Sequence, residues 1–334
     1  MRIAVVTESF APRIDETADA ARHLVDEFLT LGHELMIATT GPGVASYRGI
    51  PMVRTRRLIP AAALTQRLAT FRPDAIVAIS PRVLGAVALG GGQRLGIPTL
   101  TINPSVPIAT TLRADRHLVS HRGAVSTLAA VNVGAHLWLP GVDVDAHHPG
   151  LRDEALRSTW AKTNKLVVGF AGTATKEKVI TRLHRIAAMD DVRLVTIGAD
   201  VPTIQGAKST PARTGLDRSR AIASCDVLVQ ARKRDELVPA VRQALACGVP
   251  VVGFDAGGTR EVVQHEANGL LVRFDRNPDE PGLRGSLRRL MAEPGLRERL
   301  AAQARASVTD RSWAQAAAEI DEHLHQISRS ALAV

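Results

Sequence analysis

Short apolar runs alternate with segments of helical periodicity along the first half of the chain. Five runs predict strands, the third of them weakly: 2–8, 33–40, 52–55, 75–80 and 99–103. Between them, 17–31 carries apolar residues at helical spacing up to Gly32, and 83–90 is a helix candidate that its glycines weaken. Continuous apolar strands alternating with helices are typical of a parallel sheet covered on both faces.

The alternation starts again after a polar region. The stretch 136–143 predicts a last strand followed by a Pro-Gly turn, and polar residues cluster at 143–160, which suits a domain boundary. Further strands are predicted at 165–172, 192–198, 227–230, 250–255 and 268–272. Helices are predicted near 176–188, 216–224 and 236–247, and 283–329 is mostly helical. The predicted fold class is therefore α/β, with two doubly wound domains.

In open sheets of this kind, ligands bind at the carboxyl ends of the strands. Helix N-termini lie at that edge, and their free N–H groups favour phosphate. Two such domains would face each other across a central cleft, so the pattern predicts a ligand that carries phosphate groups.

Composition narrows the class of protein. The chain has 334 residues, 45% of them hydrophobic and 22% charged, as in a soluble globular protein of two domains. No apolar run reaches the roughly 18 residues of a membrane-spanning helix. The N-terminus runs directly into a predicted strand without the features of a signal peptide, so a cytoplasmic location is expected.

The net charge of +9 favours anionic partners, whereas the aromatic content of 3% argues against stacking on nucleic acid. Cys225 and Cys247 show neither a disulfide pattern nor a zinc-ligand spacing, and two buried thiols are expected. The chain also lacks a Gly-x-Gly-x-x-Gly motif after the first strand, so no dinucleotide is predicted.

The segment 234–263, RDELVPAVRQALACGVPVVGFDAGGTREVV, resembles the nucleotide-sugar site of family 4 retaining glycosyltransferases. These enzymes have the GT-B fold, two Rossmann-like domains that face a central cleft. The segments ESFAP at 8–12 and ISPRVLG at 79–85 resemble its branch of lipid mannosyltransferases and sulfolipid synthases. The similarity is strong over 160–275 and patchy over 1–140.

The resemblance implies transfer of a hexose of the mannose or glucose type from a nucleoside diphosphate sugar to an acceptor, with retention of configuration. It implies an acceptor domain at 1–145, a donor domain at 146–310 and a C-terminal helix at 311–334 that crosses back to the first domain. It implies no metal and no cofactor besides the donor. The acceptor would be a lipid or a glycan, met at the inner face of an anionic membrane.

The donor site of the family places cations opposite the leaving diphosphate. Lys178 matches the family's lysine, whereas Thr173 stands where the family has an arginine. A threonine donates one hydrogen bond but carries no charge. Gly172 and Gly198 are expected beside them in the donor-binding turns. The alternative for Lys178 is a solvated helix lysine.

The family also uses two glutamates separated by seven residues, one near the sugar and one at the ribose. Asp235 and Gln243 stand at these positions, and Glu236 is a substitute for the first. Leu237 and Val238 occupy the turn whose backbone meets the diphosphate. The alternative is an ordinary amphipathic helix, 237–247, capped by Asp235 or Glu236.

On the acceptor side, Asp15 and Glu16 stand where the family has small residues, and two carboxylates would repel a diphosphate unless they face away or meet a cation. Asn103 and Ser105 are the polar candidates after the strand that ends near 102. His117 and His121 are expected to be structural or solvated.

Arg54, Arg56 and Arg57 precede an apolar run, LIPAAAL. In lipid-acting members of the family such an edge lies on an anionic membrane, where each basic residue contributes on the order of 1 kcal/mol. A solvated arginine-rich turn is the alternative.

The departures from the family pattern leave a second function open. The chain would then be a catalytically degenerate member of the fold that binds or positions an active transferase. Loss of charged groups at two places would lower the rate by orders of magnitude if nothing replaced them.

Overall fold

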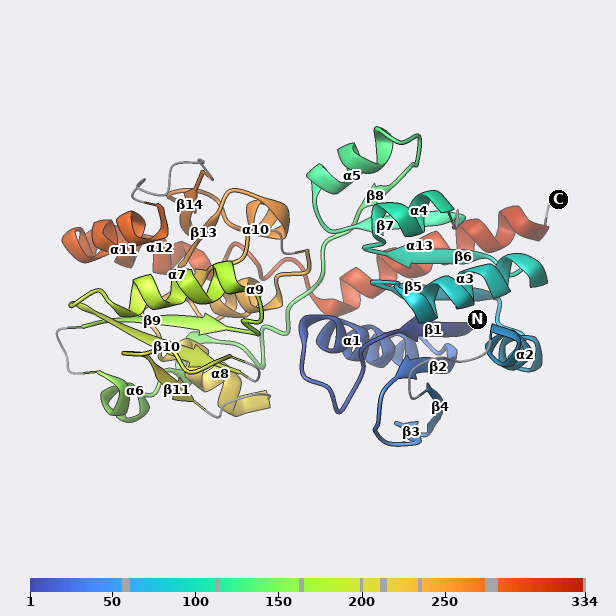
Figure 1. Cartoon of the computed structure of the whole chain (residues 1–334), viewed down its shortest axis with the longest axis horizontal. Helices are drawn as coiled ribbons and strands as arrows, with labels where there is room; N and C mark the ends of the chain where they lie inside the picture. Colours follow the sequence, from blue (N-terminus) through green and yellow to red (C-terminus); the bar gives the residue numbers. More distant parts are fainter. Residues whose placement is uncertain are drawn as a thin grey trace. The chain divides into compact units, whose positions relative to one another are not determined.

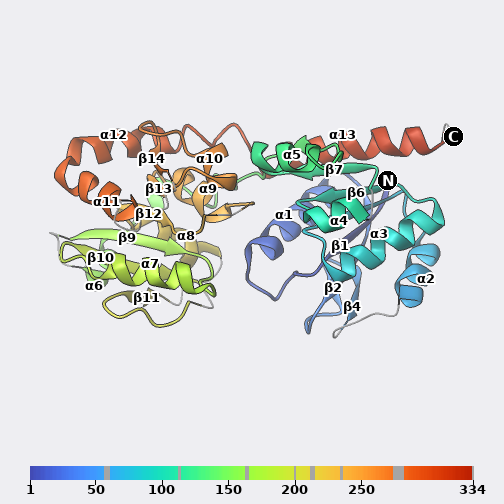
Figure 2. The ribbon, with the colours of Figure 1, turned by 45° about the horizontal axis from the view of Figure 1, so that its top comes forward.

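The computed structural model describes the following residues: 1–55, 61–111, 114–161, 165–198, 201–210, 215–233, 236–273 and 282–332. They form two compact units. Unit 1 comprises Met1–Pro140 together with Trp313–Val334, and unit 2 comprises Gly141–Ser312. Figures 1 and 2 show the red C-terminal helix, α13, among the blue and teal elements of unit 1.

Unit 1 contains a sheet with helices on both faces. Its elements in chain order are β1 (Arg2–Thr7), α1 (Glu16–Thr30), β2 (Glu34–Thr40), β3 (Ser46–Tyr47), β4 (Ile50–Thr55), α2 (Ala61–Phe71), β5 (Ala75–Ile79), α3 (Val83–Leu95), β6 (Thr99–Ile102), α4 (Val106–Thr111), β7 (Arg116–Val119), α5 (Arg122–Ala129), β8 (His136–Leu137) and α13 (Trp313–Leu332).

The strand order in unit 1 is β3-β4-β2-β1-β5-β6-β7-β8, and only the short β3 runs antiparallel to its neighbour. Leu64 and Leu68 of α2 and Leu84 and Ala88 of α3 pack on one face. Helix α1 buries Leu24, among others, and packs beside α13. The strand order reverses between β1 and β5, so a ligand of unit 1 is expected at their carboxyl ends.

Unit 2 repeats this plan with a smaller sheet. Its elements are η1 (Pro149–Leu151), α6 (Glu154–Trp160), β9 (Leu166–Ala171), α7 (Glu177–Ala187), β10 (Val192–Ile197), β11 (Lys208–Thr210), α8 (Gly215–Ala223), β12 (Val227–Gln230), α9 (Pro239–Ala246), β13 (Val251–Phe254), α10 (Gly257–Val262), β14 (Gly269–Val272), α11 (Gly282–Ala292) and α12 (Pro294–Ala304).

The six strands of unit 2 are all parallel, in the order β11-β10-β9-β12-β13-β14. Read in sequence order, this is the 3-2-1-4-5-6 arrangement of a Rossmann fold. Alternate residues of β9 point into the two cores: Val167 packs with α8 and α9, and Val168 with α7 and α11. The reversal lies between β9 and β12, which places a ligand site beside the turns that follow these two strands.

The structure corrects the prediction of a strand over 136–143. Only His136 and Leu137 pair with β7. Trp138 leaves the sheet because its ring is buried and its indole Nε1 donates to the carbonyl of Ala316, 2.9 Å away in α13. Val142 then donates to Arg311, 3.0 Å away. The helix predicted at 83–90 extends to Leu95, because Gly91 and Gly92 allow close packing against α2 and the sheet.

Candidate donor and acceptor sites

Two glycines form the turns after β9 and β10 in unit 2. Gly172 and Gly198 both have φ near +133°, a conformation that favours glycine. The N–H of Gly172 donates to Ile197, and a β-carbon on Gly198 would lie 3.0 Å from the Gly172 carbonyl oxygen. The two predicted donor-site glycines therefore lie together at the carboxyl edge, and Thr173 follows half-buried.

The turn before α9 follows β12 and lies at the same carboxyl edge of the sheet. Val238 is the N-cap of α9, with φ of 41° and only 1% of its surface exposed. Gly258, in the first turn of α10, packs directly on the backbone of Glu236 and the side chain of Val238. A left-handed valine is strained, and such strain concentrates where the surrounding structure imposes a conformation for function.

The predicted alternative for this helix, 237–247 capped by Asp235 or Glu236, is wrong for Glu236. Helix α9 begins at Pro239, and its N-cap, Val238, has no side-chain hydrogen bond to the helix. Asp235 lies outside the described residues. Glu236 is exposed, and Leu237 is buried.

Three helices of unit 2 start at this edge without a side-chain cap. The N-caps of α7, α9 and α10 are Lys176, Val238 and Ala256, and the side chain of none of them accepts a hydrogen bond from the following turn. Their first N–H groups carry the positive end of the helix dipole. Of the three, α7 and α9 follow β9 and β12, the two strands where the order reverses.

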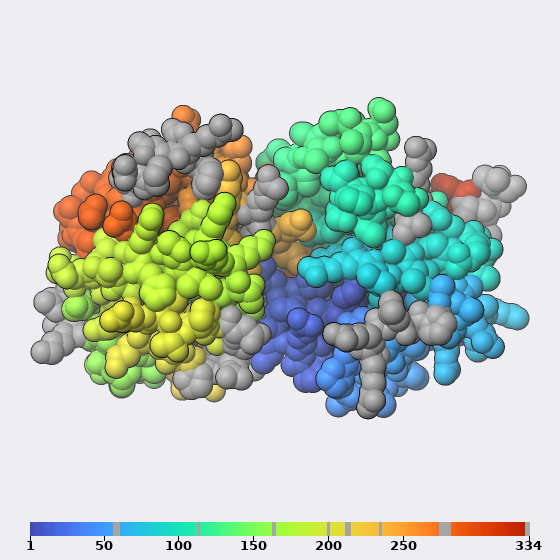
Figure 3. Space-filling view, viewed as in Figure 1, coloured from blue at the N-terminus to red at the C-terminus, as the bar shows by residue number. Residues whose placement is uncertain are grey.

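Lys178 is the second residue of α7 and is exposed. Figure 3 shows the lime segment of α7 on the visible surface of unit 2. Within the described part of the chain, no carboxylate pairs with its ammonium group, although Glu177 lies beside it in sequence. A cation in the first turn opposes the helix dipole, so this position is favourable only with an anion nearby.

Gln243 lies on the buried side of α9. Its Oε1 accepts a hydrogen bond from Nε of Arg218 in α8, 3.1 Å away. The neighbouring Arg242 is 3% exposed, and burial lowers its pKa to about 10. The guanidinium of Arg218 therefore holds the amide of Gln243 in place, and nothing in the sequence indicated this pairing.

In unit 1, the two segments ESFAP and ISPRVLG meet at the reversal point. Glu8 follows β1, and its Oε1 accepts from the N–H groups of Arg82 and Gly85 at 2.9 and 3.0 Å. Arg82 is the N-cap residue of α3, but its side chain makes no hydrogen bond to the helix. The carboxylate of Glu8 takes the place of that side-chain cap. Gly85 is required here because a β-carbon would collide with Pro81. Both segments were visible in the sequence, but their pairing over more than seventy positions was not.

Asp15 and Glu16 belong to the start of α1. Asp15 is the N-cap: Oδ1 accepts from the N–H of Ala18 at 2.9 Å, and Oδ2 accepts from the hydroxyl of Ser9. Nε of Arg13 lies 3.0 Å from the same carboxylate. Asp15 thus pairs with a cation, Arg13. Such a pairing was one of the two arrangements, besides facing away, in which a carboxylate here would not repel a diphosphate. Glu16 is half-buried in the first turn.

Asn103 follows β6 with φ of 50° and is 6% exposed. Its Oδ1 accepts from the N–H of Ser120, 2.8 Å away, whereas its Nδ2 has no partner among the described residues. Ser105 is exposed at the start of α4. His117 is buried against the hydroxyl of Thr101, 2.7 Å away, and His121 caps α5 through Nδ1, so both histidines are structural.

Arg54 has donors that bind the chain itself. Its guanidinium donates to the carbonyls of Ala11, Pro42 and Val44, and burial lowers its pKa. Arg54 therefore holds two loops together rather than forming part of a free basic edge. Arg56 and Arg57 lie outside the described residues.

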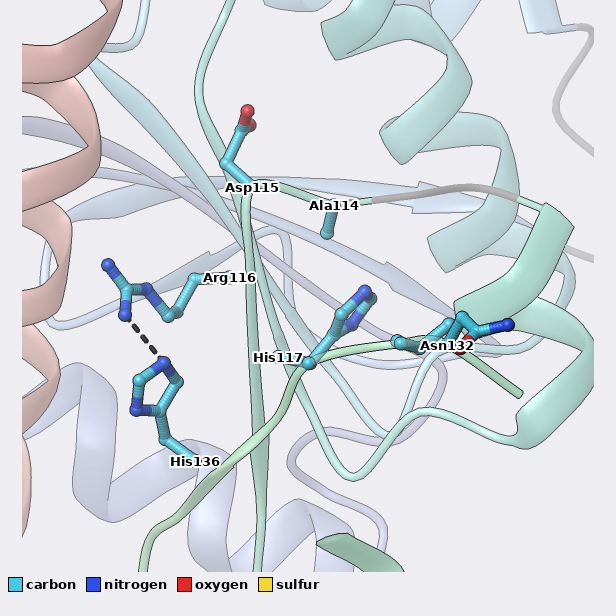
Figure 4. A pocket seen from close by; sticks show the side chains of 8 residues that line it. Ala114, Asp115, Arg116, His117, Asn132 and His136 are labelled. Carbon is cyan, nitrogen blue, oxygen red and sulfur yellow. Dashed lines mark hydrogen bonds between the residues drawn. The ribbon is translucent and has the colours of Figure 1, made fainter. Parts of the chain in front are cut away.

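A cavity of about 270 Å³ opens at the opposite, amino end of the sheet in unit 1. Figure 4 shows Arg116 and His136 side by side in it, with Nη1 of Arg116 2.6 Å from Nε2 of His136. The ring of His323, from α13, lies 5.1 Å from that of His136. Burial and the charge of Arg116 lower the pKa of both histidines. None of the predicted site residues lines this cavity.

Both cysteines are buried with free thiols. Burial raises the pKa of Cys225 far above its usual range and that of Cys247 to about 12. The neighbouring Asp226 pairs with Arg157 at 2.7 Å and accepts from the N–H of Val167 at 2.8 Å. The segment around Cys225 thus has a structural role at the amino end of β9 and β12.

Among the described residues, no group of His, Cys, Asp and Glu has the geometry of a metal site. The described helices also include none with the length and apolar character needed to span a bilayer.

Residues 215–307 match the family model of the glycosyl transferases group 1. A GDP-mannose-dependent alpha-mannosyltransferase of Mycobacterium tuberculosis (strain CDC 1551 / Oshkosh) is 32% identical, over 98% of this chain and 97% of the relative. The chain belongs to the glycosyl transferases group 1. It is a glycosyltransferase, and its relatives do not favour the degenerate alternative.

A further relative and two solved structures are also similar to this chain. The sulfoquinovosyl transferase SQD2 of Arabidopsis thaliana is 27% identical over 87% of this chain and 66% of the relative. Sucrose-phosphate synthase from Thermosynechococcus elongatus superimposes with a TM-score of 0.81 at 15% identity, covering 99% of this chain and 100% of that one. Anabaena Alr3699/HepE in complex with UDP and glucose gives 0.78 at 17% identity, covering 98% and 100%. The two sheets thus belong to a GT-B fold.

Proposed function

We propose that this group 1 glycosyltransferase transfers mannose from GDP-mannose to an acceptor hydroxyl with retention of configuration. Three relatives are named as GDP-mannose-dependent alpha-mannosyltransferases, at 27 to 32% identity. In the reaction, the bond between the anomeric carbon and the diphosphate oxygen breaks, and the acceptor oxygen bonds to that carbon. GDP leaves with the electron pair, and the hydroxyl proton is released.

The observation that carries the proposal is the uncapped edge of unit 2. The N-termini of α7 and α9 flank the reversal point, and the side chains of their N-cap residues, Lys176 and Val238, make no hydrogen bond to the helices. Lys178 adds a cation without a carboxylate partner among the described residues. A diphosphate at this edge would accept hydrogen bonds from the backbone and meet the charge that Lys178 contributes.

We assign to the other predicted residues the roles that the resemblance implies. Gly172, Thr173 and Gly198 would line the diphosphate on one side, and the backbone of Leu237 and Val238 on the other. Asp235 or Glu236 would hold sugar hydroxyls, and Gln243 the ribose. Each fixed donor aimed at the leaving group lowers the activation barrier by about 3 kcal/mol.

Calorimetry with GDP and UDP tests the proposal. We expect GDP to bind, and Lys178→Ala to weaken its binding by about 10- to 100-fold, because a hydrogen bond to a charged group contributes about 1.5–3 kcal/mol. The matched control is Lys208→Ala, which removes the same charge from the exposed start of β11 in the same unit.

Transfer of radiolabelled mannose from GDP-mannose then separates enzyme from scaffold. We expect the wild type and Lys208→Ala to be active, and Lys178→Ala to lose most of the rate. No binding of either nucleotide would contradict the proposal, and equal traces of transfer by all three proteins would favour the scaffold.

We also propose that the protein works in the cytoplasm, on a lipid or glycan acceptor, and contacts the inner face of an anionic membrane through unit 1. The net charge of +9 supports this. So do three exposed apolar side chains in loops or first turns at the carboxyl edge of unit 1, namely Ile14, Val44 and Val83. Co-sedimentation with anionic vesicles, absent with neutral ones, is the expected result.

A further inference from the structure

The two units differ in what binds the helix N-termini at the carboxyl edges of their sheets. In unit 2, the N-cap side chains of α7 and α9 make no hydrogen bond to the helices at the reversal point. In unit 1, the corresponding helices are α1, after β1, and α3, after β5, and each has a carboxylate of the chain itself on its first N–H groups. Asp15 occupies the N-terminus of α1, and Glu8 that of α3.

These carboxylates have consequences for ligands. A phosphate bound at a helix N-terminus needs free N–H groups and a positive potential. At α1 the N–H of Ala18 is bound by Asp15, whose charge Arg13 offsets. At α3 two N–H groups are bound by Glu8, for which no ion pair is seen among the described residues. A phosphate group would therefore be repelled by the carboxylate of Glu8 at the reversal point of unit 1.

Three buried polar atoms at the carboxyl edge of unit 1 have no hydrogen-bond partner among the described residues, and they indicate which ligand groups this edge could bind. They are Oε2 of Glu8, Nδ2 of Asn103 and Oγ of Ser120. Asn103 and Ser120 are 6% and 1% exposed, and Asn103 is held in a left-handed conformation. A buried polar group without a partner is unfavourable, so a ligand that supplies neutral donors and acceptors at this edge would stabilise these atoms.

We infer that unit 1 binds the acceptor through a hydroxyl-rich group that carries no phosphate, and that Glu8 determines this specificity. This inference rests on the proposed function. Hydroxyl groups donate to the free oxygen of Glu8 and accept from the amide of Asn103, whereas a phosphate offers acceptors only and adds negative charge. Glu8 also positions α3, because its other oxygen caps that helix.

Transfer from GDP-mannose to matched acceptor pairs tests the inference. The pairs are myo-inositol with myo-inositol 1-phosphate, and methyl α-mannopyranoside with its 6-phosphate. We expect the neutral member of at least one pair to be mannosylated with a kcat/KM at least about tenfold higher than its phosphate, since repulsion of even 1.4 kcal/mol gives that factor.

Glu8→Gln separates charge from structure, because the amide oxygen still accepts from Arg82 and Gly85. We expect this variant to reduce the preference for the neutral acceptor by about fivefold or more, at an unchanged melting temperature. The matched control is Asp153→Asn, the same change at the N-cap of α6 in unit 2, where Oδ1 accepts from Leu156. It should leave the preference unchanged.

Equal or better use of the phosphorylated acceptors by the wild type would overturn the inference, as would a Glu8→Gln preference equal to that of the wild type. Hydrolysis of GDP-mannose with no transfer to any neutral acceptor would also count against it. Failure of the proposed function is distinguishable, because GDP would then not bind and the donor would not be hydrolysed.

Discussion

An alanine at position 258 would displace the turn that precedes α9. A β-carbon there would overlap the carbonyl oxygen of Glu236 and lie 3.1 Å from both the carbonyl carbon of Glu236 and Cγ2 of Val238. Carbon atoms in contact are normally about 3.5–4.0 Å apart, so the carbon contacts alone require about 0.5 Å of movement. The closer oxygen raises the displacement of residues 236–238 to about 1 Å.

A shift of that size would misplace the N–H groups proposed to bind the diphosphate. Misplacement by 1 Å can lower a rate by about a hundredfold. We therefore expect Gly258→Ala to lower kcat/KM for GDP-mannose by about two orders of magnitude, although Lys178 and the acceptor side are untouched. Steady-state kinetics well below the melting temperature of the variant measures the effect.

Gly295→Ala is the matched control. Gly295 lies in the first turn of α12, as Gly258 does in α10, but nothing lies within 4 Å of an added β-carbon. The control should keep wild-type kinetics. A folded Gly258→Ala variant with kcat/KM within threefold of the wild type would refute the role assigned to the turn at 236–238.

Two further predictions concern the missing cation and the C-terminal helix. Thr173→Arg restores the charge that group 1 relatives are expected to place beside the diphosphate. We expect it to raise kcat for mannose transfer by about tenfold or more. No increase would mean that this turn does not direct the guanidinium at the diphosphate. The lowered pKa values of His136 and His323 mean that the folded state favours their neutral forms, so the docking of α13 should be full above about pH 6.5 and weaken as pH falls. Hydrogen exchange in α13 at pH 5 and 7.5, corrected for intrinsic rates, should show this opening in the wild type and less of it in His136→Gln.

Most of unit 2 could be predicted from sequence because its signals are local. The runs at 165–172, 192–198 and 250–255 coincide with β9, β10 and β13 within one or two residues. Each strand is buried on both faces, so its apolar run is continuous.

Unit 1 was harder to predict because its signals are weaker or lie far apart. Strand β7 is only four residues long and begins with Arg116 and His117. Helix α2 is buried only through Leu64 and Leu68 and was not recognised within an apolar run next to arginines. Strand β8 ends early because Trp138 binds a carbonyl 178 positions away.

The residue types of the candidate site can be read from the sequence, but the contacts between these residues cannot. The sequence indicated the glycine turns, Lys178 and the helix at Gln243, since each lies in one short segment. The capping of α3 by Glu8 joins residues more than seventy positions apart, and the packing of Gly258 on Glu236 joins two loops. Such tertiary contacts leave no periodic signal in a single sequence.

The return of α13 to unit 1 affects how the chain is made and how it can be divided. Ala316, Ile320 and Leu324 of this helix are fully buried, although they lie more than 170 residues beyond Pro140. Unit 1 is therefore completed only after α13 leaves the ribosome, and until then it exposes an apolar face to chaperones. A fragment that ends at Pro140 should be insoluble on its own, whereas one that joins 313–332 to it through a short linker should fold.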